Sequence, residues 1–216
     1  MQTFHLPSAR LYGILDTGYV DASSSAWEKT CETMLGAGID LLQLRAKGST
    51  RDERRKLLHR IQPLFAGSDT PLILNDDLLL ACEEPDVGLH LGQDDTPVEE
   101  ARKQLGPDRI LGLSTHSPAQ AAEAIAHADL IDYFAVGPVF ATPTKPTYEP
   151  VGLELVKHVA SLQPPLPWFC IGGIKLGNVA EVLEAGAAAV VVVSEILRAE
   201  EPARLIQRYH RALKKA

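Results

Sequence analysis

The sequence contains none of the long apolar runs that mark membrane proteins. No apolar stretch among its 216 residues approaches the roughly 20 residues that a membrane-spanning helix needs, so we expect no membrane partner. Its first residues, MQTFHLPSARLYG, lack the basic head and following apolar stretch of a secretory signal. We therefore expect a soluble, cytoplasmic protein.

Acidic residues outnumber basic ones, 28 to 21, and cysteine is scarce. A formal net charge of −7 does not supply the basic face that nucleic-acid binding needs, so we expect no nucleic-acid partner. The three cysteines, Cys31, Cys82 and Cys170, show no paired spacing that would predict a zinc site. An odd number of scattered thiols is typical of a reducing compartment, and we interpret all three as packing residues.

The chain has no linker or low-complexity tract that would divide it. Its 45% of hydrophobic and 23% of charged residues are ordinary for a globular protein. A chain of 216 residues can bury one substantial core. We therefore expect one domain over residues 1–216, and the composition predicts no particular oligomeric state.

Short apolar runs alternate with amphipathic segments along the whole chain. The runs are near-continuous in hydrophobicity, as expected of parallel strands that are buried on both faces. Eight β-α units predict a single (β/α)8 (TIM) barrel, although a doubly wound open sheet shows the same alternation. The expected strands are residues 11–16, 40–45, 72–75, 86–91, 109–113, 131–136, 167–171 and 188–193.

Every expected strand is followed by polar residues or glycine. In a (β/α)8 barrel the active site is built from residues at the carboxyl ends of the strands. A purely structural barrel has no need for polar chemistry gathered on one rim, so we interpret these residues as one composite site. In strand order the ends carry Asp16; Gln43, Arg45 and Lys47; Asn75 and Asp76; Gln93, Asp94 and Asp95; Ser114 and His116; Gly137; Gly172 and Gly173; and Ser194.

Two neighbouring strand ends are acidic, in the stretch LILNDDLLLACEEPDVGLHLGQDD (72–95). Carboxylates that converge on one rim repel one another unless they share a cation, and Mg²⁺ prefers oxygen ligands. We expect Asp76 and Asp95 to share Mg²⁺. The alternative is that the acids are solvated or favour a helix start, and we assign Asp77 and Asp94 mainly to that role.

The motif QLRAKGS follows the second strand and carries two cations. Gln43, Arg45 and Lys47 are spaced by two, so an extended chain points all three to the same side. A forked guanidinium and a point cation suit a pyrophosphate bridged by a divalent metal. We expect Arg45 and Lys47 to neutralise a leaving pyrophosphate, the alternative being an ordinary solvated face.

The motifs CIGGI and VVVSEI follow the seventh strand and close the eighth. Barrels commonly hold a phosphate at this place on backbone N–H groups. Gly173 would let the backbone approach such a phosphate. The alternative is that Gly172 and Gly173 only form a tight turn.

A long loop, GPVFATPTKPTYEPVG, follows the sixth strand. Loops of this length at an active rim often act as lids. Thr142, Thr144 and Lys145 could close over two phosphate groups, or the loop could be a connector without a role.

Seven motifs in order resemble the thiamine-phosphate synthase (thiamine-phosphate pyrophosphorylase) family over nearly the whole chain. They are LLQLRAKGS, LILNDD, GLHLGQDD, ILGLSTHS, FAVGPVFATPTK, CIGGI and VVVSEI. The resemblance implies a (β/α)8 barrel that joins 4-amino-2-methyl-5-hydroxymethylpyrimidine diphosphate to 4-methyl-5-(2-phosphoethyl)thiazole, carboxylated or not. It further implies Mg²⁺, a dissociative mechanism, and thiamine phosphate and pyrophosphate as products.

The resemblance also implies a role for each matching residue. Asp76 and Asp95 would hold Mg²⁺, and Arg45, Lys47 and Lys145 would be catalytic. The pyrimidine diphosphate would contact Gln43, Arg45, Lys47, Asn75, Ser114 and Lys145. The thiazole phosphate would contact Thr142, Thr144, Gly173, Val193 and Ser194.

Two other functions fit the same motifs. A thiazole tautomerase-like relative resembles the synthase but typically loses the Asn-Asp and Arg/Lys features, which this chain keeps. A non-catalytic precursor-binding protein would keep the pocket without turnover. His90 and His116 lie near the rim without an i, i+4 partner, so we interpret both as structural rather than as metal ligands.

Overall fold

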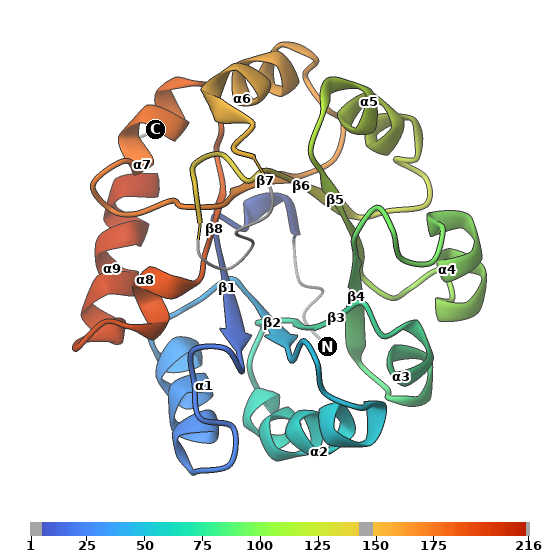
Figure 1. Ribbon diagram of the computed structural model, residues 1–216, viewed down its shortest axis with the longest axis vertical. Helices are drawn as coiled ribbons and strands as arrows, with labels where there is room; N and C mark the ends of the chain where they lie inside the picture. The colour runs from blue at the N-terminus through green and yellow to red at the C-terminus, as the bar shows by residue number, and fades with distance from the viewer. Residues whose placement is uncertain (1–5, 143–148, 215–216) are drawn as a thin grey trace.

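The computed structural model describes residues 6–142 and 149–214. Eight parallel strands form a closed barrel in chain order, and β1 pairs with both β2 and β8 (Figure 1). Closure excludes the doubly wound open sheet and confirms the predicted (β/α)8 barrel. The strands are β1 (Leu11–Asp16), β2 (Leu41–Arg45), β3 (Leu72–Asn75), β4 (Val87–Leu91), β5 (Leu111–Thr115), β6 (Tyr133–Val136), β7 (Trp168–Ile171) and β8 (Val190–Val192).

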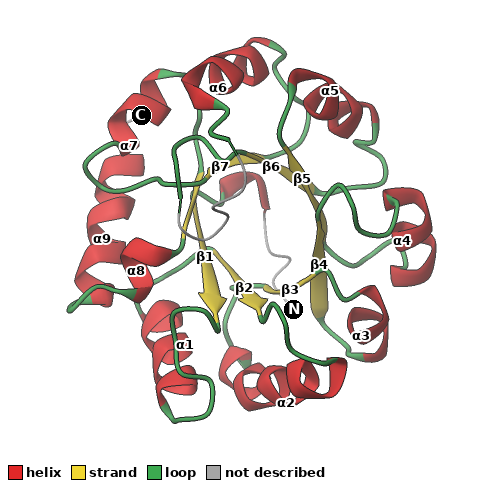
Figure 2. Cartoon of the chain, in the orientation of Figure 1, coloured by secondary structure: helices red, strands yellow, loops and turns green. Residues whose placement is uncertain are grey.

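Helices surround the strand ring on its outside (Figure 2). They are α1 (Ala26–Gly36), α2 (Arg51–Ile61), α3 (Leu78–Glu83), α4 (Val98–Leu105), α5 (Pro118–Ala126), α6 (Gly152–Ser161), α7 (Val179–Glu184), α8 (Ser194–Leu197) and α9 (Pro202–Leu213), with 3-10 turns η1 (Leu6–Ser8) and η2 (Gln62–Phe65). Within the described ranges, no helix combines the length and apolarity needed to cross a membrane.

Apolar side chains pack in two layers, one inside the barrel and one between strands and helices. Leu42 and Leu44 of β2 belong to the outer layer, whereas Leu41 belongs to the inner one. Successive side chains of a strand point to opposite faces, and both faces are covered here. This double burial explains why the strands read as continuous apolar runs.

Strand β5 lies two residues later than expected, at Leu111–Thr115 instead of 109–113. Arg109 lies before the strand, and its guanidinium donates to the carbonyls of Ala81 (2.8 Å) and Glu84 (2.7 Å). A shift of two residues preserves the alternation of faces. Ser114 therefore lies inside the strand and is 7% exposed, rather than standing after its end.

Candidate active site

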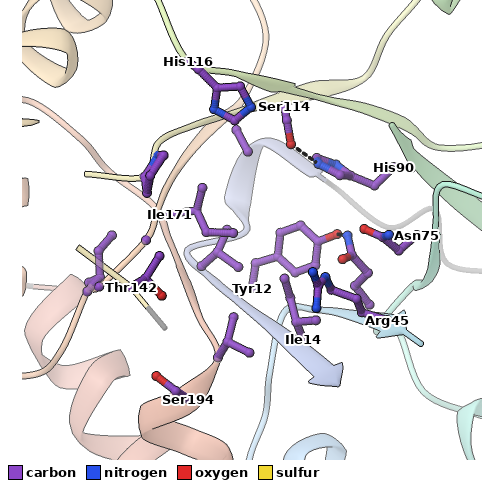
Figure 3. A pocket seen from close by; sticks show the side chains of 18 residues that line it. Tyr12, Ile14, Arg45, Asn75, His90, Ser114, His116, Thr142, Ile171 and Ser194 are labelled. Carbon is purple, nitrogen blue, oxygen red and sulfur yellow. Dashed lines mark hydrogen bonds between the residues drawn. The ribbon is translucent and has the colours of Figure 1, made fainter. Parts of the chain in front are cut away.

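A pocket opens at the carboxyl ends of the strands, and it is lined by residues from all around the barrel (Figure 3). Arg45 and Asn75 lie on one side of the pocket, and Thr142 and Ser194 lie on the opposite side. Of the predicted site residues, it brings together Gln43, Arg45, Asn75, Ser114, Thr142, Gly173, Val193 and Ser194.

The remaining predicted residues fall in three places. Lys47 and Asp76 line a second hollow, and Asn75 lines both this hollow and the pocket. Asp95 lies beside Asp76. Thr144 and Lys145 lie outside the described residues.

Arg45 is held by an ion pair that sequence reasoning did not anticipate. Its guanidinium donates to Asp16 Oδ2 at 2.5 Å, and the two side chains are 14% and 3% exposed. The other carboxylate oxygen of Asp16 accepts the N–H of Gly18 at 2.8 Å. Because β1 and β2 pair Asp16 directly with Arg45, the strand register itself sets the position of the guanidinium.

Lys47 stands on the loop between β2 and α2, and its ammonium contacts the carboxylate of Asp76. Asp76 has a left-handed backbone with φ of 65°, which is uncommon for a residue other than glycine. Its N–H donates to the carbonyl of His90 at 2.9 Å. The backbone is thus turned at the end of β3 so that this carboxylate faces the cation.

Asp76 and Asp95 form a close carboxylate pair. Burial raises the pKa of the Asp95 carboxyl, and the negative charge of Asp76 raises it further, although Gly92 N–H and Lys47 favour ionisation. Gly92 N–H donates to Asp95 Oδ2 at 2.6 Å and so holds the side chain in place. Two carboxylates that oppose each other's ionisation are an arrangement that a shared cation relieves.

The other two acids of the stretch are separate from this pair. Asp77 caps α3 and pairs with Arg51 and Arg54. Burial disfavours its ionised form, but the hydrogen bonds from Arg54, from Leu80 N–H and from Arg51 outweigh burial and lower the pKa. Asp94 is exposed. Asp77 at a helix start and Asp94 at the surface occupy the places expected for them, and that neither binds a metal stays a prediction.

The hard oxygen donors of Asp76 and Asp95 fit Mg²⁺, which keeps several waters and takes one or two carboxylates from protein. In the described ranges, no group of three or more His, Cys, Asp or Glu residues could hold a metal ion.

The backbone conformation after β7 explains why two glycines are found there. Gly172 and Gly173 have φ of 101° and 63°, where side chains are strained. A Cβ on Gly173 would lie 2.6 Å from the carbonyl oxygen of Ala141. This tight turn brings the loops after β6 and β7 together, and Phe140 N–H donates to the Gly172 carbonyl at 3.0 Å. Both glycines also line the pocket, so the turn and the binding role are compatible.

Two pocket residues, Tyr12 and His90, and the buried Tyr133 next to them were missed because they look like core residues in the sequence. Tyr12 and Tyr133 sit inside apolar strands, and His90 was assigned only a structural place. In the fold these three join Gln43 and Ser114 through buried hydrogen bonds. A polar-tipped aromatic inside an otherwise aliphatic strand is the only signal that the sequence carries, because pairing between distant strands has no local signature.

The closed barrel and its pocket define a class: a (β/α)8-barrel enzyme for small-molecule substrates, with cations and carboxylates gathered at the strand ends.

Comparisons with known proteins narrow this class. The family model described as thiamine monophosphate synthase matches residues 11–196. A thiamine-phosphate synthase of Acidothermus cellulolyticus is 42% identical over 198 residues, covering 92% of each chain. That of Deinococcus radiodurans is 41% identical over 212 residues, covering 96% of this chain and 74% of the relative. A solved thiamine phosphate pyrophosphorylase of Pyrococcus furiosus superposes with a TM-score of 0.81 at 25% identity, covering 95% of this chain and 96% of that one.

The chain belongs to the thiamine monophosphate synthase family. It is a transferase of thiamine biosynthesis, as the seven sequence motifs predicted.

Proposed function

We propose that this enzyme displaces pyrophosphate from 4-amino-2-methyl-5-hydroxymethylpyrimidine diphosphate with the thiazole nitrogen of 4-methyl-5-(2-phosphoethyl)thiazole, carboxylated or not, and forms thiamine phosphate. The observation that carries the proposal is the gathering of Arg45, Lys47, Asp76 and Asp95 at adjoining strand ends beside a buried pocket. Mg²⁺ bound by the two aspartates would neutralise charge on the departing pyrophosphate.

The chemistry needs no protein nucleophile. The bond between the methylene carbon and the diphosphate oxygen breaks, and its electron pair leaves with pyrophosphate. The thiazole nitrogen lone pair then forms the new C–N bond to the pyrimidine-methyl cation. The protein's part is to position both substrates and to stabilise charge. With the uncarboxylated thiazole no proton transfer is required, whereas the carboxylated thiazole must also lose its carboxylate as CO₂, with a proton from water taking its place on the ring carbon.

Arg45 and Lys47 supply that charge stabilisation in different ways. Asp16 orients the guanidinium, which offers paired donors to phosphate oxygens. Lys47 is 58% exposed and is a mobile point charge at the mouth of the site. Asn75 lines both hollows and joins the pyrimidine side to the diphosphate side.

The thiazole phosphate belongs on the opposite side of the pocket. Thr142 and Ser194 lie there, away from Arg45 and Asn75 (Figure 3). Gly173 and Val193 line the same pocket and offer backbone at that side. Separating two anionic groups across one pocket reduces their mutual repulsion while the reacting atoms meet between them.

The synthase is favoured over a thiazole tautomerase-like relative because the diphosphate features are complete. Asn75 ends β3 and Asp76 follows it. Arg45 ends β2 and Lys47 follows it, so all four residues lie at the same rim. A precursor-binding protein without turnover would need no carboxylate pair for a metal. Pyrophosphate release distinguishes these functions.

Pyrophosphate release is expected only when both substrates and Mg²⁺ are present. An excess of chelator should abolish release, and added Mg²⁺ should restore it, because the carboxylate pair alone repels the diphosphate. A coupled pyrophosphate assay measures this, with the coupling enzymes checked separately in chelator. Full activity in excess chelator would contradict the role assigned to Asp76 and Asp95, and release without the thiazole would contradict the condensation.

The two sides of the pocket are expected to respond separately to substitution. Arg45→Lys keeps a cation beside buried Asp16 but removes the paired donors, so it should weaken pyrimidine diphosphate binding about 10- to 100-fold. Ser194→Ala should weaken thiazole phosphate binding about tenfold. Each variant should bind the other ligand within about twofold of wild type.

Calorimetry of each variant with each ligand measures the separation. Ser194 is a better probe than Gly173, since any side chain at Gly173 strains the backbone and meets Ala141. Equal losses of both ligands in both folded variants would contradict the two-sided assignment.

A further inference from the structure

Five buried polar side chains form one continuous hydrogen-bond chain across the barrel interior. They come from β1, β2, β4, β5 and β6, and none is more than 7% exposed: Tyr12, Gln43, His90, Ser114 and Tyr133. We call them the buried chain. Its links are Gln43 Nε2 to the Tyr12 hydroxyl (2.7 Å) and the Tyr12 hydroxyl to that of Tyr133 (2.9 Å). Tyr133 then reaches His90 Nδ1 (2.9 Å), and His90 Nε2 reaches Ser114 Oγ (2.9 Å).

The donor is assigned at one end only, where Gln43 Nε2 donates to the Tyr12 hydroxyl. A phenol oxygen can accept two hydrogen bonds and donate one, so either phenol can be the donor between Tyr12 and Tyr133. One consistent direction runs from Gln43 to Ser114: Tyr12 donates to Tyr133, Tyr133 donates to His90 Nδ1, and His90 Nε2–H donates to Ser114. In that direction the neutral imidazole carries its proton on Nε2. Burial raises the pKa of both phenols, so both protons stay in place.

The two ends of the buried chain face the pocket with opposite character. Gln43 and Ser114 both line it, and Figure 3 shows Ser114 joined to His90 at its edge. In that direction the Ser114 hydroxyl accepts from His90 and keeps its own proton for the pocket, and within the described residues no hydrogen bond to Gln43 Oε1 is found. The pocket is therefore offered an acceptor at Gln43 and a donor at Ser114.

We propose that the buried chain is a positioning device that locks His90 as the Nε2–H tautomer and thereby selects an aminopyrimidine over an oxopyrimidine. The inference rests on the proposed function and deepens it. An aminopyrimidine edge places a donating amine beside an accepting ring nitrogen, which matches an acceptor at Gln43 and a donor at Ser114. An oxopyrimidine edge, with a carbonyl beside a ring N–H, presents the reverse pattern and leaves both pocket groups unpaired.

The packing around Tyr133 holds the middle of the buried chain rigid. Its ring stacks on His90 with centroids 5.5 Å apart and planes 24° apart, and it meets Tyr12 and Phe169 edge-on. Gly112 on β5 makes room for it, since a Cβ there would lie 2.1 Å from Tyr133 Cζ and 2.5 Å from its hydroxyl oxygen. A fixed Tyr133 phenol keeps its hydrogen bonds to Tyr12 and to His90 in place.

The tautomer of His90 tests the proposal without any substrate. Long-range ¹H–¹⁵N correlation on histidine-labelled protein, at a pH well above the ordinary histidine pKa, separates protonated from bare ring nitrogens. We expect His90 to carry its proton on Nε2 in the wild-type protein. A proton on Nδ1 would mean that the chain runs the other way and would overturn the proposal.

Tyr133→Phe removes the donor to Nδ1 and should shift the His90 Nδ1 resonance, whereas the matched control Tyr209→Phe should leave it unchanged. The Tyr209 phenol donates to Glu195 on the outer side of the barrel and does not enter the chain. An unchanged His90 signal in a folded Tyr133→Phe protein would overturn the proposal. The wild-type measurement stands if the variant fails to fold.

Steady-state kinetics connect the buried chain to recognition. Tyr133→Phe should raise KM for the pyrimidine diphosphate about tenfold, and KM for the thiazole phosphate should stay within about twofold. A merely structural tyrosine would affect both substrates alike, and that result would overturn the positioning role. Absence of turnover in the wild-type protein would instead contradict the proposed function, while the tautomer result would still decide the direction of the chain.

Discussion

Replacing Asp76 with Asn is expected to lower kcat/KM roughly 100- to 5000-fold while the fold stays intact. Asn keeps the side-chain volume and tolerates the left-handed backbone found at this position, with φ of 65°. The substitution leaves Asp95 as the one carboxylate of the pair, so the site holds Mg²⁺ weakly. Losing about 3 to 5 kcal/mol of charge stabilisation on the departing pyrophosphate corresponds to that range.

The matched control for this variant is Asp94→Asn, which removes an exposed acid next to Asp95. Steady-state kinetics, Mg²⁺ calorimetry and circular dichroism on both variants separate a metal role from a folding role. Asp94→Asn should stay within about twofold of wild type in kcat/KM, a change of about 0.4 kcal/mol. An Asp76→Asn protein with wild-type Mg²⁺ affinity would show that this carboxylate is not a ligand.

Replacing Lys145 with Ala is expected to slow turnover roughly 30- to 1000-fold. Lys145 lies outside the described residues, but Thr142 lines the pocket only three positions earlier. A charge contact to a leaving group in a dry site is worth on the order of 2 to 4 kcal/mol, which gives this range.

An interaction made only when the loop closes should lower kcat more than it raises KM. Closure would also keep water from the pyrimidine-methyl cation, which water would otherwise capture. Lys157→Ala is the matched control, because that lysine is 57% exposed and pairs with Glu154 on α6. A folded Lys145→Ala protein within about twofold of the wild-type kcat would reduce the loop to a connector.

The architecture could be predicted because it depends on local patterns. Runs of apolar residues at regular intervals predicted eight strands, and the predicted bounds of β1 and β3 match the structure. Two helices, α3 and α8, show no amphipathic pattern that would predict them. The α3 sequence, LLLACE, is apolar except for its last residue, Glu83, and α8 has only four residues. Neither helix could therefore be predicted from the sequence pattern.

The sequence could predict only those site residues whose position is set by the end of a strand. Residues that follow strands meet at one rim whatever the loops do, so Arg45, Asn75 and Ser194 come together as expected. Contacts across strands depend on register and on exact side-chain geometry. The Asp16–Arg45 ion pair and the buried chain through Tyr133 are contacts across strands, and no local sequence pattern predicts them.

The central claim is that this protein makes thiamine phosphate from its two precursors. The most direct measurement is to incubate the full chain with the pyrimidine diphosphate, the thiazole phosphate and Mg²⁺, and to identify the products by mass spectrometry. We predict thiamine phosphate and pyrophosphate in equal amounts, with neither formed when one precursor is left out. A folded protein that binds both precursors and yields no thiamine phosphate would contradict the account.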